Sequence, residues 1–322
     1  MSGLRGEAQT DMSDAAWLAD VVAHGMVRPS FVPPPAIREL RDLTRYRKRQ
    51  TDTRAAEVQR LEKVLQDAGI KLTSVASEVL SMSGRNMIEA LIAGQRDPTV
   101  LAEMAMGRMR NKLPALTEAL AGHFGPHHAV TAPQILDHVD FLDARIGVVS
   151  EQVAQRMTPF APAIELLVEI PGISRVSAEV VIAETGADMS RFPSPAHLAS
   201  WAGVAPGNHE SAGKRRRVGT TNGNGWLRRI LIESARAAAR TKASYFGAQY
   251  RQIAHRRGPN KAAVAVAHSL TDVIWHLLST GERFEDLGAD YYDTRRDPQR
   301  EARRLVRKLE SLGHSVTLTP TA

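Results

Sequence analysis

Apolar residues recur at helical spacing along most of the chain. Between residues 135 and 153 the apolar positions alternate steps of four and three, which predicts a helix with one continuous apolar stripe: Ile135, Val139, Leu142, Ile146, Val149 and Val153. A coiled coil or antiparallel hairpin accounts for this stripe as well as a core helix of a bundle does. Residues 37–65 keep one heptad register, but its middle seam positions are polar or charged, so we expect a long polar helix with a weak seam.

Glycine and proline mark the expected ends of the remaining helices. Residues 11–25 predict a short helix ended by Gly25, and the proline-rich residues 28–35 predict an extended connector. Further breaks divide the region before residue 135, and we expect them at Gly69, Gly84, Gly94, Pro98 and the stretch from Gly122 to Pro133.

Apolar helices are also expected within residues 161–205 and 261–280, and residues 295–313 predict a basic amphipathic helix. The composition agrees with a mainly α protein, since hydrophobic residues make up 43% and aromatic residues only 5%. There is no cysteine, which excludes disulfides and thiolate chemistry and fits a reducing cytosol. No run approaches 18 consecutive apolar residues, so we expect a cytoplasmic protein without a membrane partner.

Positive charge is concentrated in one segment. Residues 210–257 contain twelve Lys or Arg against only Glu210 and Glu233, a local balance of +10, whereas the whole chain carries +7. The rest therefore sums to −3. Such a concentration indicates a polyanionic partner, and nucleic acid is the partner that we favour over an anionic membrane surface or a merely solvated face.

Residues 164–186 predict two helices joined by a tight turn. Pro171 and Gly172 form the turn, and Ser174 can cap the second helix. This arrangement resembles a helix-hairpin-helix, in which free backbone N–H groups at the second helix's start contact a DNA phosphate. The same turn also occurs between helices that bind nothing.

A glycine-rich basic stretch, residues 201–229, contains the most informative chemistry. Its glycines allow close backbone approach to a ligand, and its cations can contact phosphates: Lys214, Arg215, Arg216, Arg217, Arg228 and Arg229. We include Asn224 in this nucleic-acid-binding set. Ser211 lies between glycines and cations, as a phosphoryl-transfer serine requires, and His209 lies two residues away. A serine that only turns the chain is the alternative reading.

Other candidate ligands are carboxylates and histidines. Asp11 and Asp14 are three residues apart on one face of the first expected helix, so both can reach one divalent cation, although an N-cap with a first-turn acid has the same spacing. His127 and His128 are expected in a loop. His268 and His276 are expected in or near the core of an apolar helix.

Several separate motifs resemble one known family and occur in its order. They are TDMSDAAWLAD, RPSFVPPPAIRELRDLTRYRKR, IPGISRVSAEVVIAETG, LASWAGVAPGNHESAGKRRRVG, GNGWLRRILIESA and KAAVAVAHSLTDVIWHLLSTGE. The chain resembles DEDD-type insertion-sequence transposases, whose members include bridge-RNA-guided recombinases, and the likeness covers nearly all of it from about residue 9.

The resemblance implies a split active site. A resolvase-like, RNase H-like α/β domain holds Mg²⁺ through four acidic residues, of which Asp11 and Asp14 match the last two. A helix-hairpin-helix transposase domain supplies the nucleophilic serine, matched by Ser211. The resemblance also implies DNA as the substrate, a guide RNA for some members, and a homo-oligomer, dimer or tetramer, joined through a coiled-coil region. Family members carry further sequence upstream, so we expect an N-terminally truncated chain with an incomplete metal site.

These observations predict a mainly α chain in four parts. Residues 1–50 are the end of a resolvase-like domain, 51–158 a helical coiled-coil region, 159–290 the transposase domain, and 291–322 a basic helix and tail. The expected function is insertion-sequence transposition by strand cleavage and transfer through the serine, with Mg²⁺ assistance. Two alternatives stay open: a non-catalytic DNA-binding remnant of such an enzyme, and a structure-selective junction nuclease.

Overall fold

The computed structural model describes residues 11–26, 31–207, 210–211, 214–215, 219–294 and 298–318. Nearly all of these residues that adopt regular structure are helical, so the prediction of a mainly α fold is confirmed. Two short strands are the exception among the described residues. The chain divides into two compact units, residues 1–34 and 35–322.

The described residues of the first unit contain one helix, α1 (Asp11–Ala23). Gly25 follows it with φ +66°, the left-handed conformation that glycine adopts at little cost, so the predicted helix end is confirmed. Residues 31–34, the described part of the predicted connector after it, have no regular structure. Several apolar side chains of α1 are exposed: Met12, Trp17, Leu18 and Val22.

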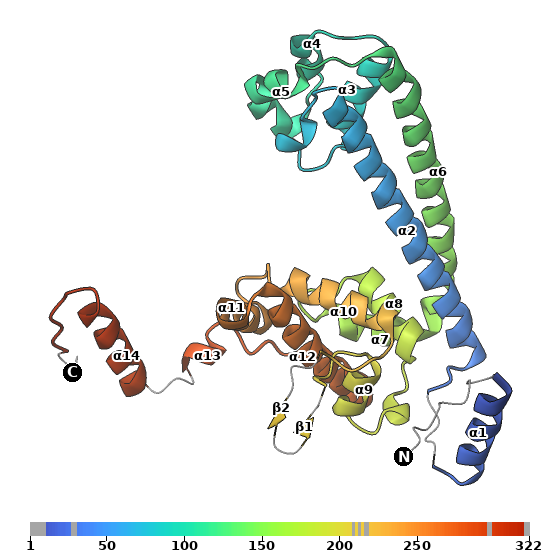
Figure 1. Cartoon of the computed structure of the whole chain (residues 1–322), viewed down its shortest axis with the longest axis vertical. Coiled ribbons are helices and arrows are strands. Elements are labelled where there is room, and N and C mark those ends of the chain that lie inside the picture. Colours follow the sequence, from blue (N-terminus) through green and yellow to red (C-terminus); the bar gives the residue numbers. More distant parts are fainter. Residues whose placement is uncertain are drawn as a thin grey trace, which may run out of the picture. The chain divides into compact units, whose positions relative to one another are not determined.

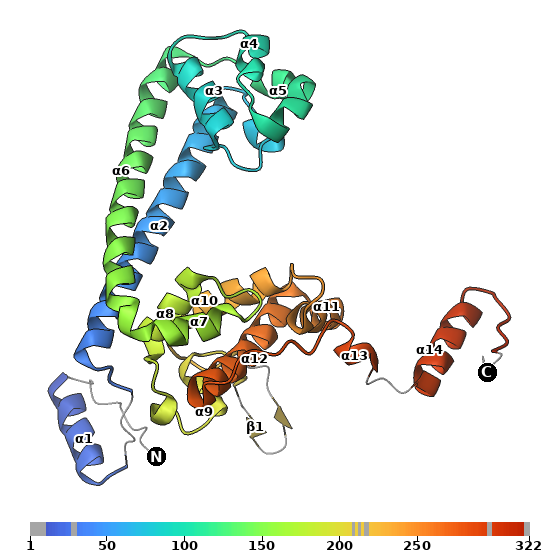
Figure 2. The same ribbon diagram turned by 180° about the vertical axis from the view of Figure 1, so that it is seen from behind.

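Two long helices form an antiparallel hairpin in the second unit: α2 (Pro35–Asp67) and α6 (Pro126–Met157). They lie side by side along their length in Figures 1 and 2. The apolar stripe of α6 faces α2 through Val139, Leu142 and Val153, so the stripe serves an antiparallel hairpin within this chain. The domain boundary predicted at residue 50 falls inside α2.

A small helical head covers one end of this hairpin. Its elements are η1 (Leu72–Ser74), α3 (Met82–Ile92), α4 (Pro98–Glu103), η2 (Gly107–Lys112) and α5 (Leu113–Leu120). They bury an apolar cluster against the ends of α2 and α6 that includes Leu61, Leu65, Met87, Leu116 and Leu136. The head therefore shares its core with the hairpin.

Three expected features of this region are wrong. Gly84 lies in the first turn of α3, where an added Cβ would come within 2.0 Å of the Val79 carbonyl oxygen, so close packing explains this glycine. Pro133 lies inside α6, not at its start. As a result, His127 and His128 belong to the first turn of α6 and not to a loop.

The remaining helices form a bundle at the other end of the hairpin (Figure 1). In chain order they are η3 (Thr158–Phe160), α7 (Ala161–Val168), α8 (Arg175–Thr185), η4 (Met189–Arg191), α9 (Pro195–Trp201), α10 (Gly225–Ala238), α11 (Tyr245–Arg257) and α12 (Pro259–Thr280). The strands β1 (Glu210–Ser211) and β2 (Lys214–Arg215) lie between α9 and α10.

Helix α12 lies at the centre of this bundle and packs against α7, α9, α10 and α11. Alanines on its buried faces, among them Ala262, Ala263 and Ala267, allow the neighbouring helices to approach closely. Of the described helices, α12 alone has the length and composition to cross a membrane, yet much of it is buried inside the bundle. His268 is partly buried as expected, whereas His276 is exposed, which corrects its expected place near the core.

Two further helices follow: α13 (Tyr291–Thr294) and α14 (Pro298–Glu310). Helix α14 falls within the predicted basic amphipathic segment. Its side chains at Leu305 and Leu309 are exposed on a helix rich in arginine.

Candidate functional site

The predicted helical hairpin is present, and its turn packs into the bundle. Ser174 caps α8, since its hydroxyl accepts a hydrogen bond from the backbone N–H of Ser177 at 3.2 Å. Gly172 has φ +91°, and a Cβ added there would lie 2.4 Å from the Ser234 carbonyl oxygen and 2.8 Å from Ala238 Cβ. This glycine therefore lets the turn touch the backbone of α10. Pro171 beside it is half-buried, whereas Arg175 and Val176 at the start of α8 are exposed.

The glycine-rich stretch folds into a β-hairpin between α9 and α10. Backbone bonds close its stem: Thr221 N–H donates to the Ala205 carbonyl at 3.1 Å and Gly207 N–H to the Gly219 carbonyl at 3.0 Å. At its base Gly203 and Gly223 touch, since a Cβ on Gly223 would come within 2.4 Å of the Gly203 nitrogen. Two of the predicted glycines are therefore required by close approach between chain segments.

Ser211 lies near the tip of this hairpin. The register pairs Ser211 with Lys214 and Glu210 with Arg215, which leaves a two-residue connection between the strands. The predicted nucleophile is thus opposite a predicted phosphate-binding lysine. His209, Arg216 and Arg217, also predicted for this site, lie outside the described residues.

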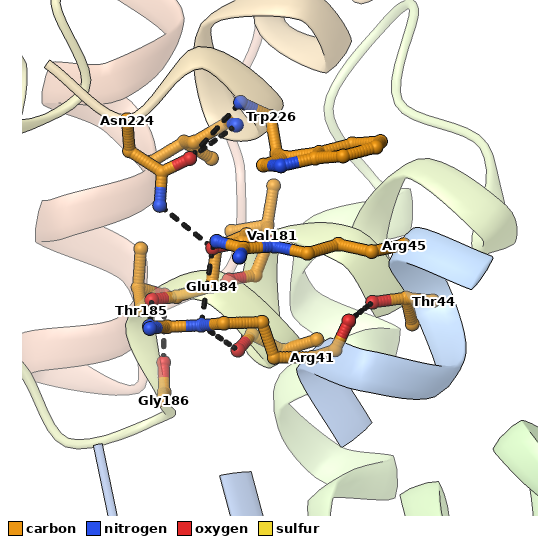
Figure 3. Close-up of polar contacts among 11 residues, drawn as sticks. Arg41, Thr44, Arg45, Val181, Glu184, Thr185, Gly186, Asn224 and Trp226 are labelled. Atoms are coloured by element: carbon orange, nitrogen blue, oxygen red, sulfur yellow. Dashed lines mark hydrogen bonds and ion pairs between the residues drawn. The ribbon is translucent and has the colours of Figure 1, made fainter. Parts of the chain in front are cut away.

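A buried carboxylate, Glu184, lies beside Asn224 and Arg45 (Figure 3). Glu184, at the end of α8, is fully buried and pairs with two arginines of α2. Arg45 donates from Nε and Nη2 to its two oxygens at 2.7 and 2.9 Å, and Arg41 Nε lies 3.1 Å from Oε2. Burial lowers the pKa of Arg41 below its ordinary value, and the charge of Glu184 opposes this effect.

Asn224 joins this cluster from the hairpin side. Its side-chain oxygen accepts hydrogen bonds from the backbone N–H groups of Trp226 and Leu227, which caps α10. Its Nδ2 donates to Glu184 Oε2 at 2.6 Å. Trp226 covers Arg45, whose guanidinium carbon lies 5.5 Å from the centre of the indole ring. The side chain of Asn224, predicted to bind nucleic acid, is engaged inside the protein.

The two predicted arginines of α10 differ in their surroundings. Arg229 donates two hydrogen bonds to Asp52 at 2.7 and 2.8 Å and a third to Glu233, and Asp52 raises its pKa. Lys48 completes this network through Asp52 and Glu233, so two cations balance two anions. Arg228 has no acidic partner among the described residues. It lines an open hollow of about 440 Å³ with Gly225, Arg229, Ile232, Glu233 and Arg236.

The predicted metal ligands lie in the first unit, in the first turn of α1. The backbone of Asp11 begins the helix, and Asp14 one turn later is exposed. Their spacing of three residues places them on one helical face, which suits a single cation.

A second group of possible ligands comes from the head end of the hairpin: Asp67, His127 and His128. The backbone N–H of Gly125 donates to His128 Nδ1 at 3.0 Å, and this fixes the ring proton on Nε2. Nε2 then donates to Asp67 at 3.0 Å, and this bond lowers the pKa of Asp67. A metal at Nε2 would have to displace that proton, so these bonds describe a helix cap better than a metal site.

Sequence reasoning missed the residues that organise this site, Arg41, Arg45 and Glu184. A partial signal was available, because Thr44 and Arg47 occupy seam positions of α2 where apolar residues are usual. Both are buried, and Arg47 donates to the buried Glu179 at 2.8 Å. The polar positions in the seam of α2 therefore lie against carboxylates of α8.

Comparisons with known proteins find transposase families in two parts of the chain. Residues 164–251, from α7 through most of α11, match the family described as "Transposase IS116/IS110/IS902 family". Residues 1–70 match a DEDD-type family of IS110 elements described as "Transposase".

Curated relatives are similar over longer stretches. A "Probable family 20 transposase" of Pseudomonas aeruginosa is 29% identical over 64% of this chain and 59% of its own length. The "Transposase for insertion sequence element IS1111A" of Coxiella burnetii is 25% identical over 86% of this chain and 68% of its own. A 42 kDa protein of insertion element IS900 from Mycobacterium paratuberculosis is 26% identical over 85% of this chain and 72% of its own.

The matched region thus spans about three fifths to nearly three quarters of the length of these relatives. Two family domains, in the order that the motifs predicted, and two relatives described as transposases agree. Residues 1–70 and 164–251 are therefore identified as transposase domains of the IS110 and IS116/IS110/IS902 type.

Proposed function

We propose that this chain breaks and rejoins DNA strands at the ends of an insertion sequence, with Ser211 as the nucleophile. The observation that carries the proposal is the register of the β-hairpin, in which Ser211 pairs with Lys214 at the tip of a stem held by backbone contacts. Backbone bonds in the stem hold residue 211 opposite residue 214, and a lysine at the paired position suits a reaction that develops negative charge at phosphorus.

The proposed reaction conserves phosphodiester bonds. The Ser211 hydroxyl oxygen attacks the phosphorus of a DNA phosphodiester, a bond from that phosphorus to a deoxyribose oxygen breaks, and a serine–DNA phosphodiester forms. The serine proton passes to a nearby base, for which His209 is the candidate in the sequence, and the leaving oxygen takes up a proton. A hydroxyl of a second DNA end then attacks the phosphoserine and releases Ser211. Neither step requires an outside energy source.

Asp11 and Asp14 are the proposed ligands of a Mg²⁺ ion. Two carboxylates on one helical face fit this ion, which commonly takes one or two carboxylates and completes its shell with water and substrate phosphate. When bound, such an ion would supply charge stabilisation to a phosphate oxygen. With only these two acids in place, we expect weak Mg²⁺ binding by calorimetry. Asp14→Asn should weaken it further, and tight binding that survives this change would contradict the assignment.

The covalent step has a direct test. Labelled element-end DNA is incubated with the protein, Mg²⁺ and any guide RNA that copurifies, and the products are separated on a denaturing gel. The wild type should yield a shifted, protease-sensitive band, and Ser211→Ala should abolish it with little loss of DNA binding, since one hydroxyl contributes about 1 kcal/mol.

Thr220→Val is the matched control for this test. It removes another hydroxyl from the same hairpin, at a position where the oxygen is buried without a hydrogen-bond partner. The covalent band should persist in this variant. A band that persists in Ser211→Ala would refute the serine nucleophile. DNA binding without any band from the wild type would favour the non-catalytic alternative. The partners predicted from the sequence, a guide RNA and a second copy of the chain, stay proposals.

A further inference from the structure

The stretch from residue 234 to 271 contains seven Lys or Arg and no Asp or Glu. It runs from the second half of α10 through α11 into the first half of α12, and these three helices pack against one another. The acid-free stretch lies outside the β-hairpin that carries Ser211, and none of its cations was among the individual residues predicted to bind nucleic acid. It continues the basic segment of residues 210–257 beyond that hairpin.

One contact ties two parts of this stretch together at the surface. The Arg236 guanidinium on the exposed side of α10 donates to Asn260 Oδ1 at the start of α12, at 3.4 Å. Asn260 is followed by Lys261 and preceded, three residues earlier, by Arg257 at the end of α11. Arg240 follows Arg236 by four residues and lies in the turn just past the end of α10. We call these four residues the basic face: Arg236, Arg240, Arg257 and Lys261.

The cations of the basic face are exposed and have no acidic partner among the described residues. Arg229, on the same helix, is held by Asp52 and Glu233. A cation that stabilises the fold is usually paired with an acidic side chain. The clustered cations of the basic face lack such a partner among the described residues, so they are available to an external anion.

The extent of this charge excludes a small anion as the sole ligand. From Arg228, in the hollow on α10, to Arg236 the helix advances eight residues, or about 12 Å, and Arg240 lies beyond its end. A membrane surface or a protein partner would need apolar anchors. Between residues 177 and 286 the described part of the chain exposes no large hydrophobic side chain. An elongated polyanion is the remaining class.

The aromatic side chains indicate a duplex over a single strand. Proteins that bind single strands present aromatic rings on which bases stack. Here Tyr245 packs edge-on against Tyr291 and stacks on Tyr292, and Phe246 is buried against Phe284. The rings of this region thus pack on one another, which leaves phosphate contact as the mode of binding.

We infer that the basic face binds the phosphate backbone of duplex DNA and forms a contact surface separate from the Ser211 hairpin. The choice of DNA rests on the proposed function, whereas the surface itself rests on the geometry. Contacts of this kind position a duplex without reading its sequence. The basic face would hold the DNA beside the site at which strands are exchanged.

Equilibrium binding of the full chain to a duplex of arbitrary sequence tests this inference. The variant combines Arg236→Gln, Arg240→Gln and Arg257→Gln. Affinity should fall, and the slope of log affinity against log salt concentration should become shallower by about 3, because each phosphate contact contributes about one. The control combines Lys63→Gln, Arg108→Gln and Arg110→Gln, which removes the same charge from exposed positions of α2 and the head. Its slope should equal that of the wild type.

Three results would overturn the inference. The first is an unchanged slope in the triple variant. The second is an equal change in the control, which would mean that net charge alone acts. The third is lost affinity for an RNA duplex with unchanged affinity for the DNA duplex, which would reassign the partner. This assay measures DNA binding, whereas the test of Ser211 measures a covalent band. The serine nucleophile can therefore be refuted while the basic face is supported, and the basic face can be refuted while the serine nucleophile is supported. Circular dichroism of both variants checks that they fold.

Discussion

Asn224 Nδ2 lies 2.6 Å from Glu184 Oε2, so the residue that caps α10 also holds a carboxylate at the end of α8. Glu184 in turn receives two arginines of α2. One buried carboxylate therefore links the long hairpin, the helix-hairpin-helix and the chain segment that leaves the Ser211 hairpin. The stability of this junction should depend on it.

Glu184→Gln should lower the free energy of unfolding by about 3 kcal/mol, because it leaves two partly buried arginines without their counter-charge. Urea denaturation measures this loss. Glu165→Gln removes the same charge from an exposed position of α7 and should change stability by less than about 0.5 kcal/mol. Equal effects of the two substitutions would mean that Glu184 contributes no more than a surface acid.

Asn224 has two roles that substitution can separate. Asn224→Ala removes both the helix cap and the bond to Glu184, and should cost about 2 to 3 kcal/mol. Asn224→Ser keeps an oxygen suited to capping and loses only the bond to Glu184, so it should be more stable than the alanine variant by about 1 kcal/mol. Thermal or urea unfolding of both proteins gives the order. The reverse order would show that the cap does not stabilise α10.

Gly172→Ala should be strongly destabilising, by more than about 2 kcal/mol, because φ is positive and a Cβ would collide with the backbone of α10. Gly147→Ala is the contrasting change. This glycine lies on the exposed side of α6 with nothing near the added atom, so alanine should stabilise the helix by about 0.5 to 1 kcal/mol. Opposite signs in unfolding measurements are the expected outcome, and destabilisation by both would contradict it.

His268 predicts a pH dependence within α12. A hydrogen bond to Asp272, whose Oδ2 lies 3.4 Å from Nδ1, raises the pKa of His268 above its ordinary value of 6.5. A raised pKa in the folded state stabilises the fold fully below pH 6.5, and this stabilisation is lost as the pH rises through the raised value. Nuclear magnetic resonance of the imidazole should show the shift, and Asp272→Asn should reverse it. An unchanged titration in that variant would exclude Asp272 as the cause.

Local signals in the sequence predicted those parts of the fold that neighbouring residues control. Gly25 ends a helix and Ser174 caps one as predicted, because both effects act within a few residues along the chain. Pro133 did not end a helix as predicted, because the packing of neighbouring side chains keeps α6 continuous. Ala132, Ile135 and Leu136 are buried in the core that α6 shares with the head, and this packing keeps the helix intact through a residue without an N–H.

The junction around Glu184 could not be predicted from local rules. An acidic residue in a helical segment ordinarily faces solvent, and its partners here, Arg41 and Arg45, precede it by about 140 residues. Conversely, the sequence grouped Arg228 and Arg229 as equivalent cations. Only the fold distinguishes them, because Asp52 of α2 reaches one and leaves the other free for a ligand.

Helix α2 is a single rod of 33 residues, about 50 Å long, with its two ends held by different forces. One end lies in the apolar core of the head, and the other is fixed by guanidinium–carboxylate pairs to α8 and α10. Because α2 is continuous between these two regions, a tilt of about 5° at its first turn would displace its last turn by about 4 Å. The position of the head is therefore set by the geometry of the charged pairs near the other end of the same helix.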